Sequence, residues 1–269
     1  MPNCDGKRCG ADDECGGTCL TGTCSGNQIC DGGRCHDCDV CLPAGACPYR
    51  SVQAAVDPGG PATIRICSGI YVEDSTAQFR AVNITRSLRL VGSGDGLDPT
   101  TNTHLRPKIT SKQVVGASGD SGIIEVTLDR LHITGGTGAN GRGVGFASVI
   151  GTISNCTITG NESRLSGGSL GAFITNTRVT LINTHVTNNT GLGAGGIGVG
   201  GNVRVTLDAL SRVTRNVATA GFGGIRNDPG GIVDLAIVAN VTGNFSSGTN
   251  PNCGGGGQFN GEGMICQGI

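Results

Sequence analysis

The sequence predicts an all-β fold: a right-handed parallel β-helix of three sheets, with a cap helix and a small disulfide-rich module at its N-terminal end. Three observations predict this fold. A strand-like motif that ends in threonine recurs at nearly constant spacing, 50 of the 269 residues are glycine, and ten of the 14 cysteines lie between Cys4 and Cys47. We therefore expect a cysteine-rich module over residues 1–47 and a β-helix over residues 48–269.

The composition excludes several classes of protein. Glycine makes up about 19% of the chain (50 of 269) without a Gly-X-Y period, which excludes collagen. The charged fraction of 14% and the net charge of −1 are not typical of disordered chains, and they provide no field that attracts nucleic acid or anionic membranes. No apolar run approaches the ~20 residues that span a bilayer. We expect a folded protein with no nucleic-acid partner and no membrane span.

Five segments of the β-helix align as copies of one repeat, and a Gly-Gly pair recurs between the copies. Three short strands in such a repeat, parted by Gly and Asn, are typical of one rung of a β-helix, whereas a propeller blade needs about 40 residues. The repeated threonines are Thr134, Thr159, Thr187, Thr214 and Thr242. The aligned segments are VTLDRLHITGG (126–136), GTISNCTITGN (151–161), VTLINTHVTNN (179–189), VTLDALSRVTRN (205–216) and VDLAIVANVTGN (233–244).

Stacking of these rungs aligns equivalent residues in columns. We expect a ladder at one turn, in which the side-chain amides of neighbouring rungs share hydrogen bonds. Its members are Asn161, Asn189, Asn216 and Asn244. The Val or Ile immediately before each repeated threonine should point inward, at positions 133, 158, 186, 213 and 241. Such a core needs few aromatic residues, in agreement with the aromatic content of 3%.

Disulfide bonds should order residues 1–47, because apolar residues are nearly absent there. Dense cysteines are typical of oxidising compartments, so we expect the protein outside the cell or at its surface. One alternative is a zinc site, since Cys35, His36, Cys38 and Cys41 are zinc-ligand types in close spacing. A crowd of ten cysteines also produces such spacings by chance, and we favour the disulfides.

A short helix and further cysteines should close the two ends of the β-helix. Residues 51–56 are expected to form an amphipathic helix with a serine at its N-terminus, placed over the open end of the apolar stack. Cys47 and Cys67 bracket this helix and are candidates for a disulfide bond that holds it. Cys253 and Cys266 are candidates for one that closes the last loop. The pairing of the other cysteines stays open.

Two parts of the chain resemble known families. The string CDGKRCGADDECGGTC (4–19) is similar to cysteine-rich modules of large secreted bacterial proteins, which implies an extracellular setting. The strings CPYRSVQAAVDPGGPATIRICSGIYVED (47–74) and LRLVGSGDGLDPTTNTHL (88–105) resemble the opening of bacterial right-handed β-helix repeat proteins with a pectin-lyase-like fold. The Gly-Gly-Ile and Thr-x-Asn repeats resemble those of polymorphic outer-membrane adhesins. The resemblance implies the fold but no single activity, because this fold hosts lyases, esterases, epimerases, adhesins and phage spikes.

No set of residues is assigned as catalytic. Pectin methylesterases carry their nucleophile in an Asp-Phe-Ile-Phe-Gly string that this chain lacks. A glycosidase needs two carboxylates about 5–10 Å apart. Asp129 and Asp208 should lie three rungs apart, roughly 14 Å at ~4.8 Å per rung, too far to act on one bond. Glu125 and Asp234 have no evident carboxylate partner within one rung. With no tryptophan to stack on sugars, the sequence favours a protein that is not an enzyme.

Two further predictions concern polar residues on the outside. Asp95 and Asp98, in a loop of sequence GSGDGLDP, are candidate calcium ligands, the only cofactor that the sequence suggests, although a turn of Gly, Asp and Pro explains them equally well. His132 and His185 should share an outward column with Thr157 between them. We interpret these histidines as solvent-facing surface residues rather than as a catalytic or metal pair.

These observations lead to the hypothesis of a secreted or cell-surface protein with a structural or adhesive role. Its expected partners are further copies of itself, joined head to tail in filaments, or an extracellular polysaccharide. Head-to-tail assembly is suggested by residues 250–269, which lack an amphipathic cap, since an uncovered last rung invites strand pairing. The alternative is a polysaccharide-active lyase or hydrolase, or a carbohydrate-binding module. It predicts a groove along one sheet lined by Arg and Asp from neighbouring rungs.

Overall fold

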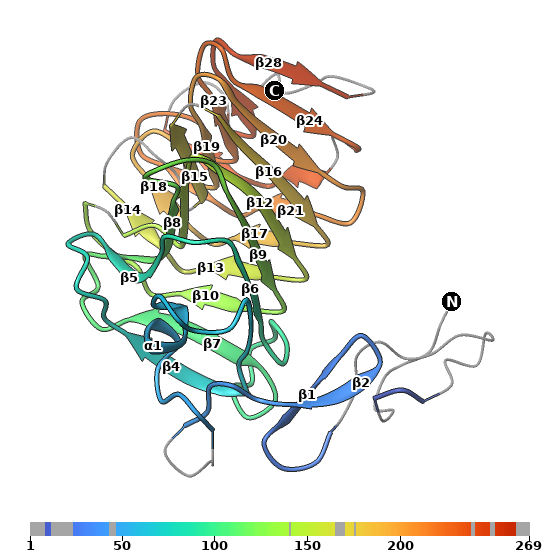
Figure 1. Cartoon of the computed structure of the whole chain (residues 1–269). Helices are drawn as coiled ribbons and strands as arrows, with labels where there is room; N and C mark the ends of the chain where they lie inside the picture. Colours follow the sequence, from blue (N-terminus) through green and yellow to red (C-terminus); the bar gives the residue numbers. More distant parts are fainter. Residues whose placement is uncertain are drawn as a thin grey trace.

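The chain forms a parallel β-helix whose consecutive rungs stack along one axis (Figure 1). The helix α1 (Val52–Val56) lies at the N-terminal end of the stack, and a hairpin of β1 (Gln28–Asp31) and β2 (Arg34–Asp37) lies beside that end. The predicted all-β solenoid with a disulfide-rich N-terminal region is therefore confirmed. The computed structural model describes residues 9–11, 24–42, 47–139, 141–164, 170–174 (backbone only), 176–237, 240–247 and 251–261. Within this part of the chain, no helix has the length and apolar character needed to cross a membrane.

Three long parallel sheets, here named A, B and C, run along the β-helix. Sheet A contains, in spatial order, β3 (Thr63–Arg65), β6 (Leu88–Val91), β9 (Ile124–Asp129), β12 (Val149–Ser154), β16 (Thr177–Ile182), β20 (Val203–Leu207), β24 (Ile232–Leu235) and β28 (Gln258–Asn260). Sheet B contains β4 (Gly69–Glu73), β7 (Thr103–Pro107), β10 (His132–Thr134), β13 (Thr157–Thr159), β17 (His185–Thr187), β21 (Arg212–Thr214) and β25 (Val241–Thr242). Sheet C contains β5 (Arg80–Ile84), β8 (Gln113–Ser118), β11 (Val144–Ala147), β15 (Leu170–Ile174), β19 (Ile197–Val199), β23 (Ile225–Asn227) and β27 (Cys253–Gly254).

A fourth, smaller parallel sheet, named D, was not expected from the sequence. It is formed at the turn between sheets B and C by β14 (Glu162–Ser163), β18 (Thr190–Gly191), β22 (Val217–Ala218) and β26 (Phe245–Ser246). Each of these strands follows directly after one asparagine of the predicted ladder. Such short strands cannot show an alternating pattern, so the sequence does not reveal them.

The pairing register keeps apolar side chains in columns inside the β-helix. In sheet A, one such column runs through Leu90, Leu128, Ile153, Leu181, Leu207 and Leu235, each paired with the next and at most 5% exposed. In sheet B, the residues at 133, 158, 186 and 213 are fully buried and Val241 is 5% exposed, which confirms the predicted inward stack. Burial of these columns supplies the main stabilisation of the fold.

The predicted asparagine ladder is confirmed. Asn161 Nδ2 donates to Asn189 Oδ1 at 3.2 Å, Asn189 Nδ2 to Asn216 Oδ1 at 3.0 Å, and Asn216 Nδ2 to Asn244 Oδ1 at 3.0 Å. Each of these acceptor oxygens also accepts the backbone N–H of the asparagine one rung before it, at 3.0–3.1 Å. The ladder is 0–7% exposed and continues to Asn252 Oδ1, which accepts from Asn244 Nδ2 at 3.2 Å. These buried amides are therefore satisfied by one another and by backbone carbonyls of the rung before.

The backbone before each ladder residue explains why the turn can repeat. Gly160, Asn188, Arg215 and Gly243, which directly precede the ladder asparagines, all have a φ between 53° and 64°. Glycine and asparagine adopt this left-handed region at low cost, and they occupy three of the four positions, with Arg215 at the fourth.

The N-terminal end of the apolar stack is covered by α1, as predicted. Ser51 Oγ accepts a hydrogen bond from Ala54 N at 3.1 Å, and Val52, Ala55 and Val56 are buried. The carboxylate of Glu73 accepts hydrogen bonds from the backbone N–H groups of Val52 and Gln53 at 2.7 and 3.0 Å, so it satisfies donors that a helix start leaves free. The cap is thus fixed to β4 by hydrogen bonds as well as by apolar contact.

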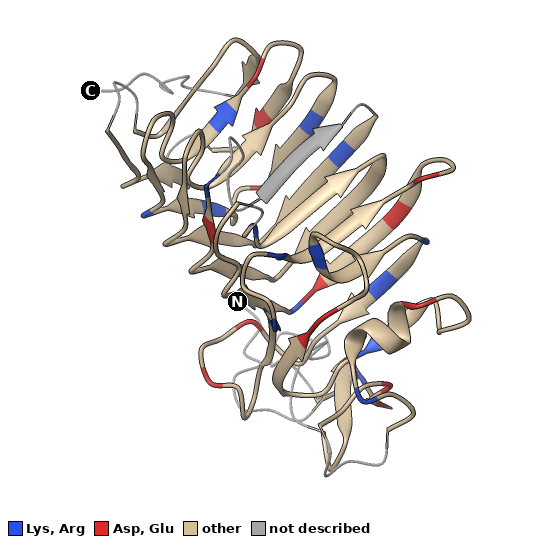
Figure 2. Ribbon diagram, turned by 90° about the vertical axis from the view of Figure 1, so that its left-hand side faces the viewer, with Lys and Arg blue, Asp and Glu red and all other residues tan. Residues whose placement is uncertain are grey.

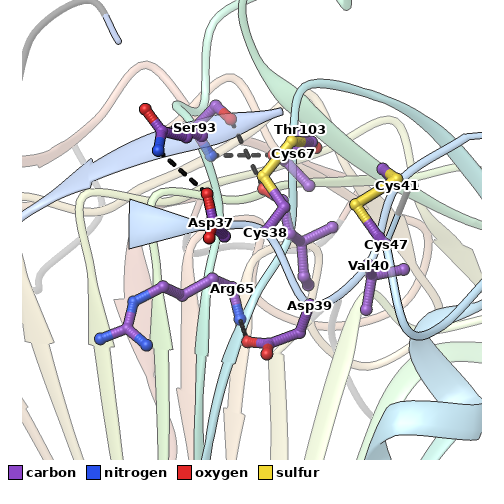
Figure 3. Close-up of a disulfide and its surroundings, with 12 residues drawn as sticks. Asp37, Cys38, Asp39, Val40, Cys41, Cys47, Arg65, Cys67, Ser93 and Thr103 are labelled. Atoms are coloured by element: carbon purple, nitrogen blue, oxygen red, sulfur yellow. Dashed lines mark hydrogen bonds between the residues drawn. A yellow bond between two sulfur atoms is a disulfide. The ribbon is translucent and has the colours of Figure 1, made fainter. Parts of the chain in front are cut away.

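The expected disulfide bond between Cys47 and Cys67 is wrong. Cys67 is bonded to Cys38 and Cys47 to Cys41, with Cα–Cα distances of 5.6 and 5.7 Å (Figure 3). The reason is that Val40 pairs in parallel with Ile66, and its carbonyl accepts from Cys67 N at 3.0 Å. Residues 38–42 therefore lie along the first rung, which brings Cys38 next to Cys67.

The zinc alternative is also wrong, since Cys35 is bonded to Cys24 and neither Cys38 nor Cys41 has a free thiol. A further bond joins Cys9 to Cys30. Cys253 is disulfide-bonded, and its expected partner Cys266 lies outside the described residues. Cys156 is a free thiol inside the β-helix, where burial raises the pKa of the thiol and keeps it protonated.

The ladder predicts a large effect of the substitution Asn189→Ala. It removes hydrogen bonds to the amides of Asn161, to Asn216 Oδ1 and to the carbonyl of Ile158, and it leaves the buried backbone N–H of Asn161 without its partner. We expect the free energy of unfolding to fall by about 2–3 kcal/mol, at ~1–3 kcal/mol per unsatisfied buried group. Chemical denaturation measures this difference. The control is Thr187→Ala, a half-exposed position on β17, for which we expect a change below ~0.5 kcal/mol. Equal effects of the two substitutions would contradict the role of the ladder.

Candidate functional site

A shallow groove of about 380 Å³ lies on the outer face of sheet A, over β12, β16, β20 and β24. Ile150, Arg178, Arg204 and Ile232 line it, and each is the direct register partner of the next. They form one outward column that runs along the β-helix axis at ~4.8 Å per rung. The groove is therefore a product of the stacking and not of any single loop.

The turns that enter sheet A form one side of the groove. Asn176, Asn202 and Gly230 line it from three consecutive rungs, and all have a left-handed φ, of 67°, 59° and 85°. Since Asn and Gly tolerate this conformation, each rung makes the same tight turn before its strand in sheet A. Because the turns have equivalent geometry, Arg178 and Arg204 occupy equivalent positions on neighbouring rungs.

The two arginines of the groove differ in their partners. Arg204 forms two hydrogen bonds with the carboxylate of Asp234 at 2.6 and 3.1 Å, and Asn260 and Thr206 also donate to that carboxylate. Burial by itself raises the pKa of Asp234, but these hydrogen bonds and the charge of Arg204 outweigh it, and the pKa is lowered. Arg178 has no ion pair or hydrogen bond from its side chain to the described residues. The groove thus holds one neutralised arginine and one unpaired positive charge.

This arrangement is suited to binding an anion. A guanidinium group offers several N–H donors in a plane, which match a carboxylate or sulfate. Ile150 is 39% exposed beside Arg178, so the groove also offers apolar surface. Along the ribbon, Lys, Arg, Asp and Glu occur as separate short bands on different strands and loops (Figure 2). A ligand with spaced negative groups fits this pattern better than a compact polyanion.

The groove was expected only in outline. Arginines from neighbouring rungs line it, but Arg178 and Arg204 were not among the predicted site residues. Both precede the sequence Val-Thr-Leu in their repeats, so their common column was available from the alignment. The next repeat has Ile232 at this position, and its Asp234 replaces the threonine of Val-Thr-Leu. Asp234 lies in the outward column next to the column of Arg204 and Ile232, so its carboxylate reaches Arg204.

The described carboxylates do not form a catalytic pair in the groove. Asp129 and Asp208 lie three rungs apart, as predicted, since β9, β12, β16 and β20 are consecutive. The pKa of Asp208 is lowered like that of Asp234, because hydrogen bonds from Ser211 and Asn183 outweigh the effect of burial. Glu73 has a raised pKa because of burial, but it lies under α1 and not in the groove. A glycosidase needs an acid with a raised pKa beside a second carboxylate, which this set does not provide.

A second cluster of polar residues lies where the loop of residues 92–102 covers sheet B. His132 Nδ1 is 2.9 Å from the carbonyl of Asp95, and His104 Nε2 is 2.9 Å from the carbonyl of Gly96. Thr157 Oγ1 donates to Asp95 Oδ2 at 2.7 Å. The two imidazole rings are stacked with their centroids 4.3 Å apart. Side chains of three rungs therefore hold one loop against the sheet.

The interpretation of His132 as a solvent-facing residue is wrong, because the loop covers it and leaves it 4% exposed. The predicted column of His132, Thr157 and His185 is confirmed by the register, and His185 is exposed. His104, which pairs with His132 in the same column, was not predicted from the sequence. Its segment is less regular than the five aligned repeats, so the register could not be read there.

Asp95 and Asp98 have structural partners in this loop. Asp98 Oδ1 accepts from Thr100 N at 2.9 Å and from Thr100 Oγ1 at 2.7 Å, which closes the turn. Among the described residues, the two aspartates are not part of a group of three or more carboxylate, imidazole or thiol ligands. Cys9, Cys24 and Cys35 do form such a group, but all three are disulfide-bonded. Calcium binding by Asp95 and Asp98 stays a prediction.

Comparison with known proteins does not assign this fold or its groove to a family. No protein-family model, no curated protein and no solved structure matches the chain. The parallel solenoid and the disulfide-bonded N-terminal region rest on the structure alone.

The histidine pair predicts that the loop of residues 92–102 weakens in acid. Burial, and next the charge of His132, lower the pKa of His104 below its ordinary 6.5. A group whose pKa is lower in the folded than in the unfolded state stabilises the fold above its unfolded pKa. This stabilisation is lost as the pH falls from 6.5 through the lower pKa that His104 has in the folded protein. The protection of the Asn102 and Thr103 amides, whose N–H groups bond within the loop, should therefore fall below pH 6.5 once their exchange rates are corrected for the intrinsic effect of pH.

The variant His104→Gln keeps an N–H donor near Gly96 but does not titrate. We expect it to keep most of the protection that the native loop loses in acid, whereas His185→Gln, at an exposed position of the same column, should lose protection like the native protein. An identical pH dependence of loop exchange in the native protein and in His104→Gln would contradict this account.

Proposed function

We propose that the protein is a secreted or cell-surface adhesive β-helix that binds an acidic extracellular polysaccharide along the outer face of sheet A. The observation that carries the proposal is the column of the groove, in which Arg178 and Arg204 lie one rung apart. A linear polymer that lies along the axis meets an equivalent surface at every ~4.8 Å rung. Its acidic groups would bind Arg178 directly and compete with Asp234 for Arg204.

The disulfide bonds support the compartment of this proposal. Four bonds join described cysteines between Cys9 and Cys67, and disulfides persist in oxidising compartments outside the cytoplasm. The similarity of the sequence strings to secreted bacterial modules and to outer-membrane adhesins agrees with an extracellular site of action. Polysaccharides are the polymers that a surface protein meets there.

Binding is favoured over cleavage by the state of the carboxylates. Asp234, which contacts the groove residue Arg204, is ionised and already bonded to that arginine, so it is not a proton donor. Neighbouring threonines at 127, 152, 180 and 206 form the adjacent outward column of sheet A, and their hydroxyls suit hydrogen bonds to sugars. This combination binds a chain without the acid and base needed to break it.

Head-to-tail assembly is a second form of the structural proposal. It requires that the last strands of one molecule pair with the first rung of another. At the first rung, however, Asp39 N and Val40 N donate to the carbonyl of Arg65, and α1 packs against β4 and β5. Val40 would have to leave before another chain pairs there. These contacts weigh against filaments, and sedimentation velocity across a concentration series tests them.

The substitution Arg178→Ala tests the binding proposal. We expect it to weaken binding to alginate, a carboxylate-bearing polysaccharide, by about tenfold, because a hydrogen bond to a charged group contributes ~1.5–3 kcal/mol. Arg178 is exposed and without a partner among the described residues, so the melting temperature should not change. The matched control is Arg106→Ala, an exposed arginine on the outer face of sheet B. Dextran, which is uncharged, should bind weakly to all variants.

Two results would contradict the proposal. Equal alginate affinity of the native protein and Arg178→Ala would show that the groove is not the binding site. A loss of alginate viscosity during incubation, retained in Arg106→Ala, would show that the protein cleaves the polymer and would favour the enzymatic alternative.

A further inference from the structure

The tip of the β1–β2 hairpin places one carboxylate against the β-helix. The strands are joined by the Gly32–Gly33 turn, with φ values of 62° and 77° that fit a tight hairpin. Asp31, just before this turn, is 9% exposed and lies among three arginines. Arg89 holds its carboxylate through both Nη atoms at 3.0–3.1 Å, and Arg65 and Arg130 contact it at 3.2 and 3.5 Å.

The arginines keep an excess of positive charge around this carboxylate. Asp129 is the second carboxylate of the cluster, 2.9 Å from Arg89 and 3.4 Å from Arg130. The cluster thus contains three guanidinium groups and two carboxylates. Without Asp31, Asp129 would be the one carboxylate beside three guanidinium groups, and the cluster would carry a net charge of +2. Such a site accepts a carboxylate by the same bidentate geometry that Asp31 uses now.

The hairpin is tethered at one end and held at its tip mainly by polar contacts. The disulfide Cys38–Cys67 ties the residue after β2 to the first rung, where Figure 3 shows it beside Cys41–Cys47. Near the tip, Arg130 donates to the carbonyl of Cys30, and Ile29 packs in a small cluster with Val91 and four cysteines. The tip can therefore leave the arginines while the hairpin stays attached.

The arginine cluster and the groove lie on the same face of the β-helix. Arg89 pairs with Thr127, and its column continues through the threonines at 152, 180 and 206 beside Arg178 and Arg204. From β6 to β16 there are three steps between paired strands, about 14 Å at ~4.8 Å each. One polymer chain that follows this face reaches both sites.

We propose that Arg65, Arg89 and Arg130 form a second carboxylate-binding site on sheet A, that Asp31 closes it as an internal ligand, and that an acidic polymer held in the groove displaces Asp31. This inference rests on the proposed function of the groove. The tethered Asp31 has a high effective concentration, so a free monomeric acid competes poorly with it. A polymer already bound at Arg178 presents its next acidic groups at a comparable effective concentration and is the ligand able to open the site.

The variant Asp31→Asn tests the inference, with Asp37→Asn as its matched control. Asp37 lies on the other strand of the same hairpin, is exposed and accepts a hydrogen bond from the Gln28 side chain. We expect Asp31→Asn to bind alginate about tenfold more tightly than the native protein, because the apparent affinity rises with the fraction of molecules in the open form. Asp37→Asn should bind like the native protein. Dextran sulfate in place of alginate shows whether sulfate groups serve as well as carboxylates.

A second measurement follows the hairpin without any substitution. Amide exchange of residues 28–37 should increase when alginate saturates the native protein, because displacement of Asp31 frees the tip. Unchanged exchange, together with equal alginate affinity of Asp31→Asn and native protein, would overturn the inference. If Arg178→Ala still weakens binding in that case, the proposed function stands without the second site. If neither the native protein nor Asp31→Asn binds alginate or dextran sulfate, both proposals fail.

Discussion

The register between neighbouring rungs depends on the asparagine ladder and on the parallel strand pairing beside it. Each ladder asparagine receives hydrogen bonds from the rung before it and donates to the rung after it, so a shift of one residue would leave several buried amides unpaired. A shift of one residue would also turn the apolar columns of sheets A and B outward, because side chains alternate along a strand. Polar and apolar constraints therefore select the same register, and the position of every outward side chain follows from it.

The surface features described above are consequences of this register. Arg178 and Arg204 are neighbours only because residues one repeat apart in the sequence are paired across β16 and β20. The same stacking places Arg65, Arg89 and Asp129 on three consecutive strands of sheet A, where the hairpin docks. The loop of residues 92–102 is held by side chains of β7, β10 and β13 for the same reason. A β-helix of this kind builds a site from single residues of successive rungs, and each rung needs to supply only one or two of them.

The sequence predicts those parts of the structure that repeat or that depend on near neighbours. The ladder, the inward stack and the column of His132, Thr157 and His185 follow from the period, and α1 follows from a local pattern with Ser51 at its start. The pairing of Cys38 with Cys67 could not be predicted, because it depends on the bridge between Val40 and Ile66, and this bridge lies outside the repeated segments. Burial of His132 depends on a loop from another rung, and the contact of Asp31 with three arginines depends on the docking of the hairpin. Each of these is a single long-range contact, so it produces no repeated pattern in the sequence.

The exchange rate of the ladder side-chain amides tests the role of the ladder most directly. The NH₂ groups of Asn189 and Asn216 are buried, and each donates to a backbone carbonyl and to the next asparagine. Hydrogen exchange followed by NMR should find their protons protected to a degree similar to the backbone amides of β16 and β20, while the exposed side chains of Asn176 and Asn202 exchange freely. Exchange of the ladder amides as fast as that of Asn176 and Asn202 would mean that the ladder does not hold the rungs in register, and the arrangement of the outer face would need another cause.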